Sequence, residues 1–233
     1  KISDIYCPMY PSPDDMVYHV KYDTASNHKP FSLVEYAHAM GNTDGNFNDY
    51  WDTIRKYYPK MQGGYIWDFV DQGFQKITDR GDTIGSYGGD YGVNLPSDEN
   101  FNDNGLVAPD RSLHPQMLEV KKIYQNIFTT LVDVKNAKIK IYNENFFKDL
   151  QDVYLEWQLI GDGKVIEKGK NEVLNVLPQQ TSILDLHYKT PLSGYKEVFL
   201  NVCYKTKREE GFLPANWDIA RDQLLIYSNQ DQQ

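Results

Sequence analysis

The chain contains the stretch FSLVEYAHAMGN at residues 31–42, which indicates both the fold class and the place of the chemistry. Residues 31–36 form a nearly continuous apolar run, as expected for a parallel strand that is covered on both faces. Glu35 stands within the end of this run, where an unpaired carboxylate would be costly to bury. Such a carboxylate is usually paired in a salt bridge, bound to a metal or catalytic, and both a structural and a catalytic interpretation stay open on this evidence.

Strand and helix patterns alternate on both sides of this stretch. The expected elements are, in chain order, a strand over 2–10, a helix over 14–22, a strand over 31–36, a helix over 47–57, a strand over 65–70 and a helix from about residue 114. This alternation predicts a parallel sheet. Three strand–helix units cannot close a barrel of eight, so they form a small open sheet or the last units of a barrel. The long Gly-, Asp- and Asn-rich loop over 71–112 is expected to be functional or folded on itself.

The pattern changes near residue 129 to strands and turns. Alternating runs occur at 138–142 and 155–159, Gly161-Asp162-Gly163 is a hairpin signal, and further strands are expected over 181–186 and 198–204. Short strands at regular spacing predict an immunoglobulin-like β-sandwich, most simply a structural or interface module. We therefore predict two domains, residues 1–128 and 129–233.

Bulk composition excludes several functions. The 233 residues carry a formal net charge of −9, which argues against nucleic acid as a partner. No apolar run approaches the length of a membrane span. Two cysteines, Cys7 and Cys203, are too few for a disulfide framework or a metal motif. The first residues have no signal-peptide pattern and look like a strand in progress, so we expect a longer natural protein, and the compartment, cytoplasmic or periplasmic, stays undetermined.

Candidate functional residues lie where the expected strands end. In parallel α/β folds the working residues gather at the carboxyl ends of strands. That rule selects Tyr10, then Glu35, Tyr36 and His38, and then Trp67, Asp68 and Asp71. A lone histidine is often structural and Trp67 could be ordinary core packing. Asp68 and Asp71 lie near a substrate or pair with Arg or backbone donors.

Several motifs then carry a resemblance to a known family. The run EYAHAMGN, residues 35–42, resembles the nucleophile signature of the family 2 glycoside hydrolases and, more narrowly, of the large bacterial β-galactosidases. CPMY at 7–10, QGGYIWDFVDQ at 62–72, SYGGDYG at 86–92 and NGLV at 104–107 follow the same family in order. The resemblance covers most of the chain and is strongest through residue 125. It implies the last three β/α units of a TIM (β/α)8 barrel followed by an all-β immunoglobulin-like sandwich.

The resemblance also implies roles for individual residues. Glu35 matches the nucleophile of a retaining mechanism, which forms a covalent glycosyl-enzyme that water hydrolyses. Tyr10 matches a tyrosine that hydrogen-bonds this carboxylate. His38 matches a galactose-contacting histidine, and Trp67 matches a tryptophan that packs against the apolar face of the sugar.

A sodium site is implied in the same way. The backbone carbonyl of Phe101 and the side chain of Asn104 match ligands of a sodium ion beside the sugar's 6-hydroxyl. Neutral oxygen ligands suit a hard, weakly charged cation. The magnesium ligands of the family match no position in this chain and are expected upstream of it.

The second carboxylate of a retaining hydrolase is also expected upstream. In the family it lies in an Asn–Glu pair on an earlier barrel strand, whereas Asn143-Glu144 and Asn171-Glu172 fall in the expected sandwich. We therefore expect a fragment of a longer enzyme that is inactive, or nearly so, alone. A partial barrel exposes strand edges, which favours homo-oligomers in addition to the rest of the parent chain as a partner.

Other functions stay open. β-Glucuronidases and β-mannosidases share the fold and the glutamate, although EYAHAMGN and the Phe101/Asn104 pair favour β-galactosides. A non-catalytic carbohydrate-binding or assembly module, with binding by the sandwich, is the alternative from a different class. The natural galactoside and its linkage are not predicted.

Overall fold

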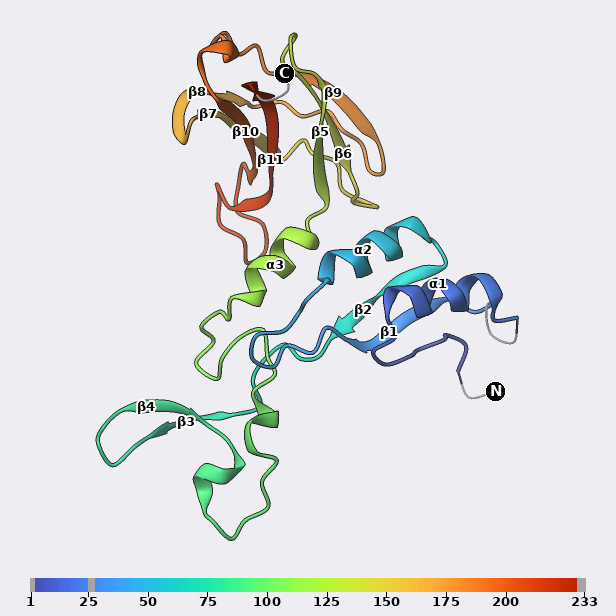
Figure 1. Ribbon diagram of the computed structural model, residues 1–233, viewed down its shortest axis with the longest axis vertical. Helices are drawn as coiled ribbons and strands as arrows, with labels where there is room; N and C mark the ends of the chain where they lie inside the picture. The colour runs from blue at the N-terminus through green and yellow to red at the C-terminus, as the bar shows by residue number, and fades with distance from the viewer. Residues whose placement is uncertain (1–2, 25–27, 230–233) are drawn as a thin grey trace. The chain divides into compact units, whose positions relative to one another are not determined.

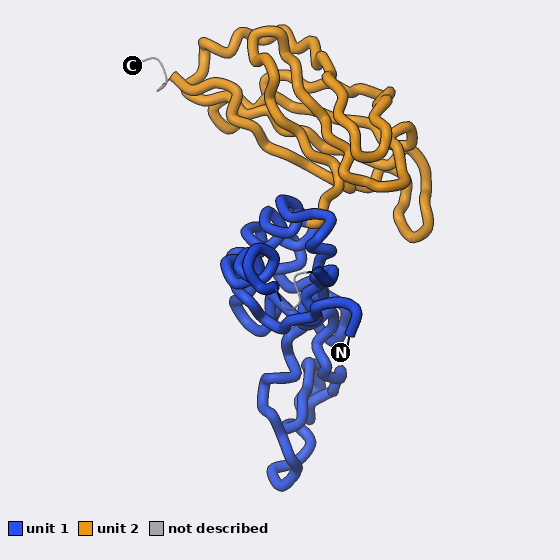
Figure 2. Tube along the Cα trace, turned by 90° about the vertical axis from the view of Figure 1, so that its right-hand side faces the viewer, with its two compact units in different colours: residues 1–123 blue, residues 124–233 orange. Residues whose placement is uncertain are grey.

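The fold consists of two compact units, residues 1–123 and residues 124–233 (Figure 2). The structure is a computed structural model, and it describes residues 3–24 and 28–229. The division falls a few residues before the expected boundary at 128/129. Among the described residues, none of the helices has the length and apolar character needed to cross a membrane.

A two-stranded parallel sheet with flanking helices forms the centre of the first unit. Strand β1 (Phe31–Tyr36) pairs with β2 (Met61–Ile66), with Phe31 opposite Met61 and Tyr36 opposite Ile66. The helices are α1 (Pro13–Tyr22), α2 (Phe47–Lys56) and α3 (Gln116–Ile123) (Figure 1). Helix α2 contacts α1, α3 and β2. From α1 onward, the expected order of helices and parallel strands is present in this unit.

Local sequence explains where the helices begin. Ser12 caps α1, because its hydroxyl accepts from the Asp15 amide while the Asp15 carboxylate accepts from the Ser12 amide. Pro13 occupies the first turn, where its missing N–H costs nothing. Helix α2 buries Phe47 and Ile54, one face of the expected helical repeat. Asn46 precedes α2 with a left-handed backbone, and its side chain makes no capping hydrogen bond.

The expected strand over 2–10 is only partly formed. Its first residue lies outside the described residues, and the remainder contacts β1 through isolated bridges, Tyr6 with Phe31 and Met9 with Glu35. Pro8 has no N–H to donate to a ladder, and Tyr10 has a φ of 51°. The segment runs parallel to β1, but the prediction of a regular strand is wrong for these reasons.

The expected strand over 65–70 is misplaced. The strand is β2, and Gly63 and Gly64 lie inside it rather than before it. A Cβ on Gly64 would lie 2.7 Å from the Cβ of Leu33 and 2.9 Å from Cε1 of Tyr36. The glycine thus permits a close approach of β2 to β1, a role that is easily mistaken for a turn signal.

The long loop after β2 is folded on itself, as expected. It contains the antiparallel hairpin of β3 (Phe74–Ile77) and β4 (Thr83–Ser86). Two short 3-10 turns follow, η1 (Gly88–Tyr91) and η2 (Glu99–Asn102) (Figure 1). The segment after η2 returns to the residues that follow β2, where Val107 bridges Val70.

The second unit consists of two antiparallel sheets over one apolar core. One sheet has the order β11 (Asp218–Ser228), β10 (Glu197–Thr206), β7 (Val153–Gly161) and β8 (Lys164–Asn171). The other has the order β5 (Ile127–Asp133), β6 (Lys138–Asn143) and β9 (Thr181–Asp185), and a 3-10 turn, η3 (Leu192–Gly194), lies before β10. Every second residue of β10 is buried, as in a strand with one face toward a core.

A turn and a buried hydrogen bond support this arrangement of strands. Asp162 and Gly163, with φ of 47° and 81°, form the two-residue turn between β7 and β8, so the expected hairpin is confirmed. The buried hydroxyl of Tyr204 on β10 lies 2.6 Å from the Thr129 hydroxyl on β5. This hydrogen bond joins the two sheets across the core and satisfies both hydroxyls.

Candidate active site

Glu35 lies near the carboxyl end of β1, beside the turn that carries Tyr10. The Tyr10 amide donates to the Glu35 carbonyl at 3.0 Å, which fixes the two backbones side by side. The Tyr10 hydroxyl also donates to the Glu35 carboxylate. Burial, this hydrogen bond and the negative charge of Glu35 together raise the pKa of Tyr10 from 10.0 to about 12. Tyr10 is therefore a neutral donor that holds the Glu35 side chain in place.

His38 and Asn104 come together although 66 residues separate them in sequence. Nδ2 of Asn104 lies 3.4 Å from Nε2 of His38 and donates to the Phe101 carbonyl at 2.9 Å. The His38 ring also lies 5.5 Å from the Phe101 ring and 6.2 Å from the Tyr10 ring, centroid to centroid. His38 therefore connects the Tyr10–Glu35 pair to the segment that carries Phe101 and Asn104.

Asn104 has one unsatisfied atom. The residue is 2% exposed, and its Oδ1 has no hydrogen-bond partner among the described residues. A buried amide oxygen without a partner is costly, and a cation would satisfy it. The neighbouring Phe101 carbonyl is a second neutral oxygen ligand of the kind that sodium accepts. The two residues therefore fit the implied sodium site. No cluster of three or more His, Cys, Asp or Glu in the described part of the chain has the arrangement of a metal site.

Trp67 lies directly after β2. Its amide donates to the Tyr36 carbonyl at 3.0 Å, and its carbonyl accepts from the Ala39 amide at 2.8 Å. The backbone of Trp67 therefore links the ends of both strands and keeps the segment with His38 near the strand ends. The expected contact of its indole with a sugar stays a prediction.

Asp68 and Asp71 bind mainly backbone donors, the second of the two possibilities that the sequence leaves open. Oδ1 of Asp68 accepts from the amides of Phe69 and Val70, while Oδ2 accepts from the Gln72 side chain at 2.7 Å. Asp71 is buried and accepts from the Gly105 amide at 2.7 Å. Both carboxylates thus shape the loop that follows β2.

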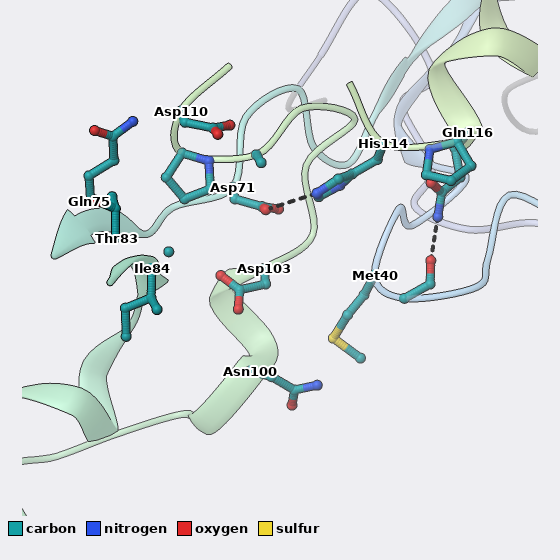
Figure 3. A pocket seen from close by; sticks show the side chains of 15 residues that line it. Met40, Asp71, Gln75, Thr83, Ile84, Asn100, Asp103, Asp110, His114 and Gln116 are labelled. Carbon is teal, nitrogen blue, oxygen red and sulfur yellow. Dashed lines mark hydrogen bonds and ion pairs between the residues drawn. The ribbon is translucent and has the colours of Figure 1, made fainter. Parts of the chain in front are cut away.

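A cavity of about 510 Å³ is lined in part by this loop (Figure 3). Its wall includes Asp71, Asp103, Asp110 and His114, and neither Glu35 nor Tyr10 lines it. Burial, followed by the charges of Asp71 and Asp90, raises the pKa of Asp103, while His114 opposes the rise. Sequence reasoning treated His114 only as the start of a helix. The sequence marks His114 only by its position directly before Pro115, at the expected start of the helix.

The two Asn–Glu pairs of the second unit have structural contacts. Asn143 is fully buried at the end of β6, and its Nδ2 donates to the carbonyls of Lys148 and Val176 at 2.9 and 3.2 Å. Glu172 forms an ion pair with Lys170 at 2.8 Å. These contacts give structural roles to Asn143 and Glu172, one member of each pair.

Comparison with known proteins identifies the family. The model described as "Glycosyl hydrolases family 2, TIM barrel domain" matches residues 1–129, and that described as "Beta-galactosidase, domain 4" matches residues 139–227. A beta-galactosidase of Psychromonas ingrahamii is 42% identical over 86% of this chain and 19% of its own length. Those of Pseudoalteromonas haloplanktis and Priestia megaterium are 37% and 35% identical, over 97% and 96% of this chain and 23% and 21% of their own lengths.

This chain spans about a fifth of the length of these relatives. The barrel model alone matches more than half of the chain, through the residues that form β1, β2 and the candidate site. The chain therefore belongs to the family 2 glycosyl hydrolases and comprises the C-terminal part of their TIM-barrel domain followed by a β domain.

Proposed function

We propose that this chain is the part of a retaining β-galactosidase that carries the catalytic nucleophile, Glu35. The observation that carries the proposal is the Glu35 carboxylate at the end of β1, held by the Tyr10 phenol. His38 and Asn104, 3.4 Å apart, supply polar groups beside that pair. The names of the relatives support galactosides as the substrate class.

Glu35 attacks the anomeric carbon of a terminal β-galactoside in the first step. A bond forms between a carboxylate oxygen and that carbon while the glycosidic C–O bond breaks. The leaving oxygen takes a proton from an acid/base carboxylic acid. Water, deprotonated by the same group, then hydrolyses the ester and returns Glu35 to its ionised form. Tyr10 donates throughout, because a phenol is protonated at neutral pH and the raised pKa of Tyr10 extends this into the alkaline range.

The acid/base carboxylate belongs to an upstream segment of the parent chain. Retaining hydrolases need two carboxyl groups roughly 5–5.5 Å apart across the bond. We propose that this chain supplies the last three β/α units, and that upstream strands close the eight-stranded barrel beside β1 and β2. The second unit is proposed to be an immunoglobulin-like sandwich with a structural role.

The remaining site residues are proposed to bind the substrate and the cation. His38 donates to or accepts from a sugar hydroxyl, and Trp67 packs against the apolar face of the ring. The Phe101 carbonyl and the Asn104 amide oxygen would hold a sodium ion, which would supply positive charge to a substrate hydroxyl. Magnesium ligands are proposed to lie upstream, outside this chain.

Turnover of an activated aryl β-galactoside tests the proposal. The complete enzyme should hydrolyse it, Glu35→Gln should reduce kcat by about 10⁴-fold or more, and this chain alone should show no turnover. Glu144→Gln is the matched control, because Glu144 lies in the second unit, and it should keep full activity. Aryl β-glucuronides and β-mannosides, assayed beside it, test the sugar preference.

A labelling experiment gives an independent result. A 2-deoxy-2-fluoro galactoside slows hydrolysis of the glycosyl-enzyme, so the adduct can be located by mass spectrometry of peptides. The label should lie on the peptide that contains Glu35. A label on another carboxylate, or full activity in Glu35→Gln, would contradict the proposed nucleophile.

A further inference from the structure

Gly105, the residue after Asn104, is held by side chains on both of its backbone polar groups. Its amide donates to Oδ1 of Asp71 at 2.7 Å, and its carbonyl lies 2.8 Å from Nδ1 of His114. The other ends of the two side chains face each other, with Nε2 of His114 3.5 Å from Oδ2 of Asp71 (Figure 3). Asp71, His114 and Gly105 thus form a closed ring of polar contacts.

The surroundings of Gly105 leave no space for a side chain. A Cβ there would lie 2.1 Å from the Asp71 nitrogen and 2.4 Å from the Val70 carbonyl carbon, so only glycine fits. Asp71 is 6% exposed, and the hydrogen bond it accepts is shielded from water. Shielded contacts to a charged group are stronger than exposed ones, because water does not compete for them.

Neighbouring backbone hydrogen bonds extend this fixed region to Asn104. The Asn104 carbonyl accepts from the Asp68 amide at 2.6 Å, and the Leu106 amide donates to the Asp68 carbonyl at 3.1 Å. The His114 amide donates to the Leu106 carbonyl at 3.0 Å. Residues 104–106 are therefore fixed on one side by the loop after β2 and on the other by the start of α3.

We propose that Asp71 and His114 are positioning residues that act through Gly105 to place the Asn104 amide and, through it, the Phe101 carbonyl. Neither side chain touches the proposed sugar or cation. They fix the backbone that carries the ligating oxygens, as second partners of metal-binding residues commonly do. The inference rests on the proposed function of Asn104, and it gives a role to the buried Asp71 and the half-buried His114, which the nucleophile mechanism does not use.

The test compares variants of the complete enzyme. Asp71→Ala and His114→Ala remove one contact each to Gly105. His114→Asn keeps a side-chain nitrogen close to the position of Nδ1, so it should restore much of what His114→Ala loses. Asp110→Asn is the matched control: Asp110 lines the same cavity, but its carboxylate accepts from Ser112 and does not contact Gly105.

Three quantities are measured for each variant: sodium affinity by calorimetric titration with NaCl, KM and kcat for an aryl β-galactoside, and hydrogen exchange of the peptide that contains Gly105. We expect Asp71→Ala and His114→Ala to weaken sodium binding and raise KM by roughly 10–100-fold, with a smaller change in kcat and faster exchange. His114→Asn should lie close to the wild type, and Asp110→Asn should match it.

Two outcomes would overturn the inference. One is faster exchange at Gly105 with unchanged sodium affinity and KM, which would mean a purely structural pair. The other is equal losses in His114→Ala and His114→Asn. If Asp71→Ala does not fold, the two His114 variants decide. A failure of the proposed function would look different. Glu35→Gln would then keep turnover, whereas sodium affinity would still measure the placement of Asn104.

Discussion

The side chains of Tyr10 and Glu35 are coupled by a hydrogen bond, so a change at Glu35 should shift the pKa of Tyr10. Burial is the largest cause of the raised pKa of Tyr10, and the hydrogen bond and charge of Glu35 add to it. We expect Glu35→Gln to lower the pKa of Tyr10 from about 12 part of the way toward 10.0. NMR of tyrosine labelled at Cζ measures this directly, with Tyr10→Phe to assign the signal.

The sign of this effect on stability follows from the direction of the shift. A pKa raised in the folded state means that the contribution of Tyr10 to stability is fully present below about 10 and is lost as pH rises through about 12. Glu35→Gln should weaken that alkaline loss. A pKa of Tyr10 that does not change in the variant would contradict the hydrogen bond.

Asp44 gives a second pH-dependent prediction. Neither of its carboxylate oxygens has a hydrogen-bond partner among the described residues, and burial raises its pKa from 3.8 to about 6. Its contribution to stability is therefore fully present below pH 3.8 and is lost as pH rises through about 6. The full shift corresponds to about 3 kcal/mol, which partial exposure reduces to about 1 kcal/mol.

We expect Asp44→Asn to stabilise the chain by about 1 kcal/mol at pH 7 and to have no effect near pH 3.5. Asparagine tolerates the left-handed backbone of this position, whose φ is 64°. Urea unfolding at both pH values measures the difference. Equal stabilisation at both pH values would mean that charge is not the cause.

At the scale of elements, β7 and β8 depend on the contact of Gly169 with Trp157. A Cβ on Gly169 would lie 2.3 Å from Cζ2 of Trp157, a residue that is 5% exposed and packed in the core. We expect Gly169→Ala to lower the free energy of unfolding by about 1–3 kcal/mol through overpacking. Gly194→Ala is the control, because nothing lies within 4 Å of its added Cβ. Similar unfolding midpoints for both variants would contradict this packing.

Elements also differ in how far their sequence signals could be trusted. Strand β1 and helix α2 follow their patterns closely, because an apolar run and a helical repeat each report burial directly. Strand β2 was misplaced, since a glycine that permits close packing looks the same in sequence as one that makes a turn. The segment before Tyr10 failed as a regular strand because Pro8 interrupts its ladder.

At the scale of the whole molecule, β2 has an unpaired edge. Within the described residues β2 pairs only with β1, so its other edge presents unpaired backbone groups. Such edges favour pairing with another chain. We expect this chain, alone, to form homo-oligomers, and size-exclusion chromatography with light scattering over a range of concentrations measures this. A monomer at high concentration would contradict the expectation.

Sequence by itself determined the family, the place of Glu35 at a strand end, the change to strands after the barrel part and the hairpin at Asp162-Gly163. Those features are local, because period, turn chemistry and a continuous motif are read within a few residues of one another. Only the tertiary structure decided that Asn104 meets His38, that Oδ1 of Asn104 lacks a partner, and that Asp71 and His114 enclose Gly105. These contacts join residues 9 to 66 positions apart, and loop packing, which leaves no periodic trace in a sequence, brings them together.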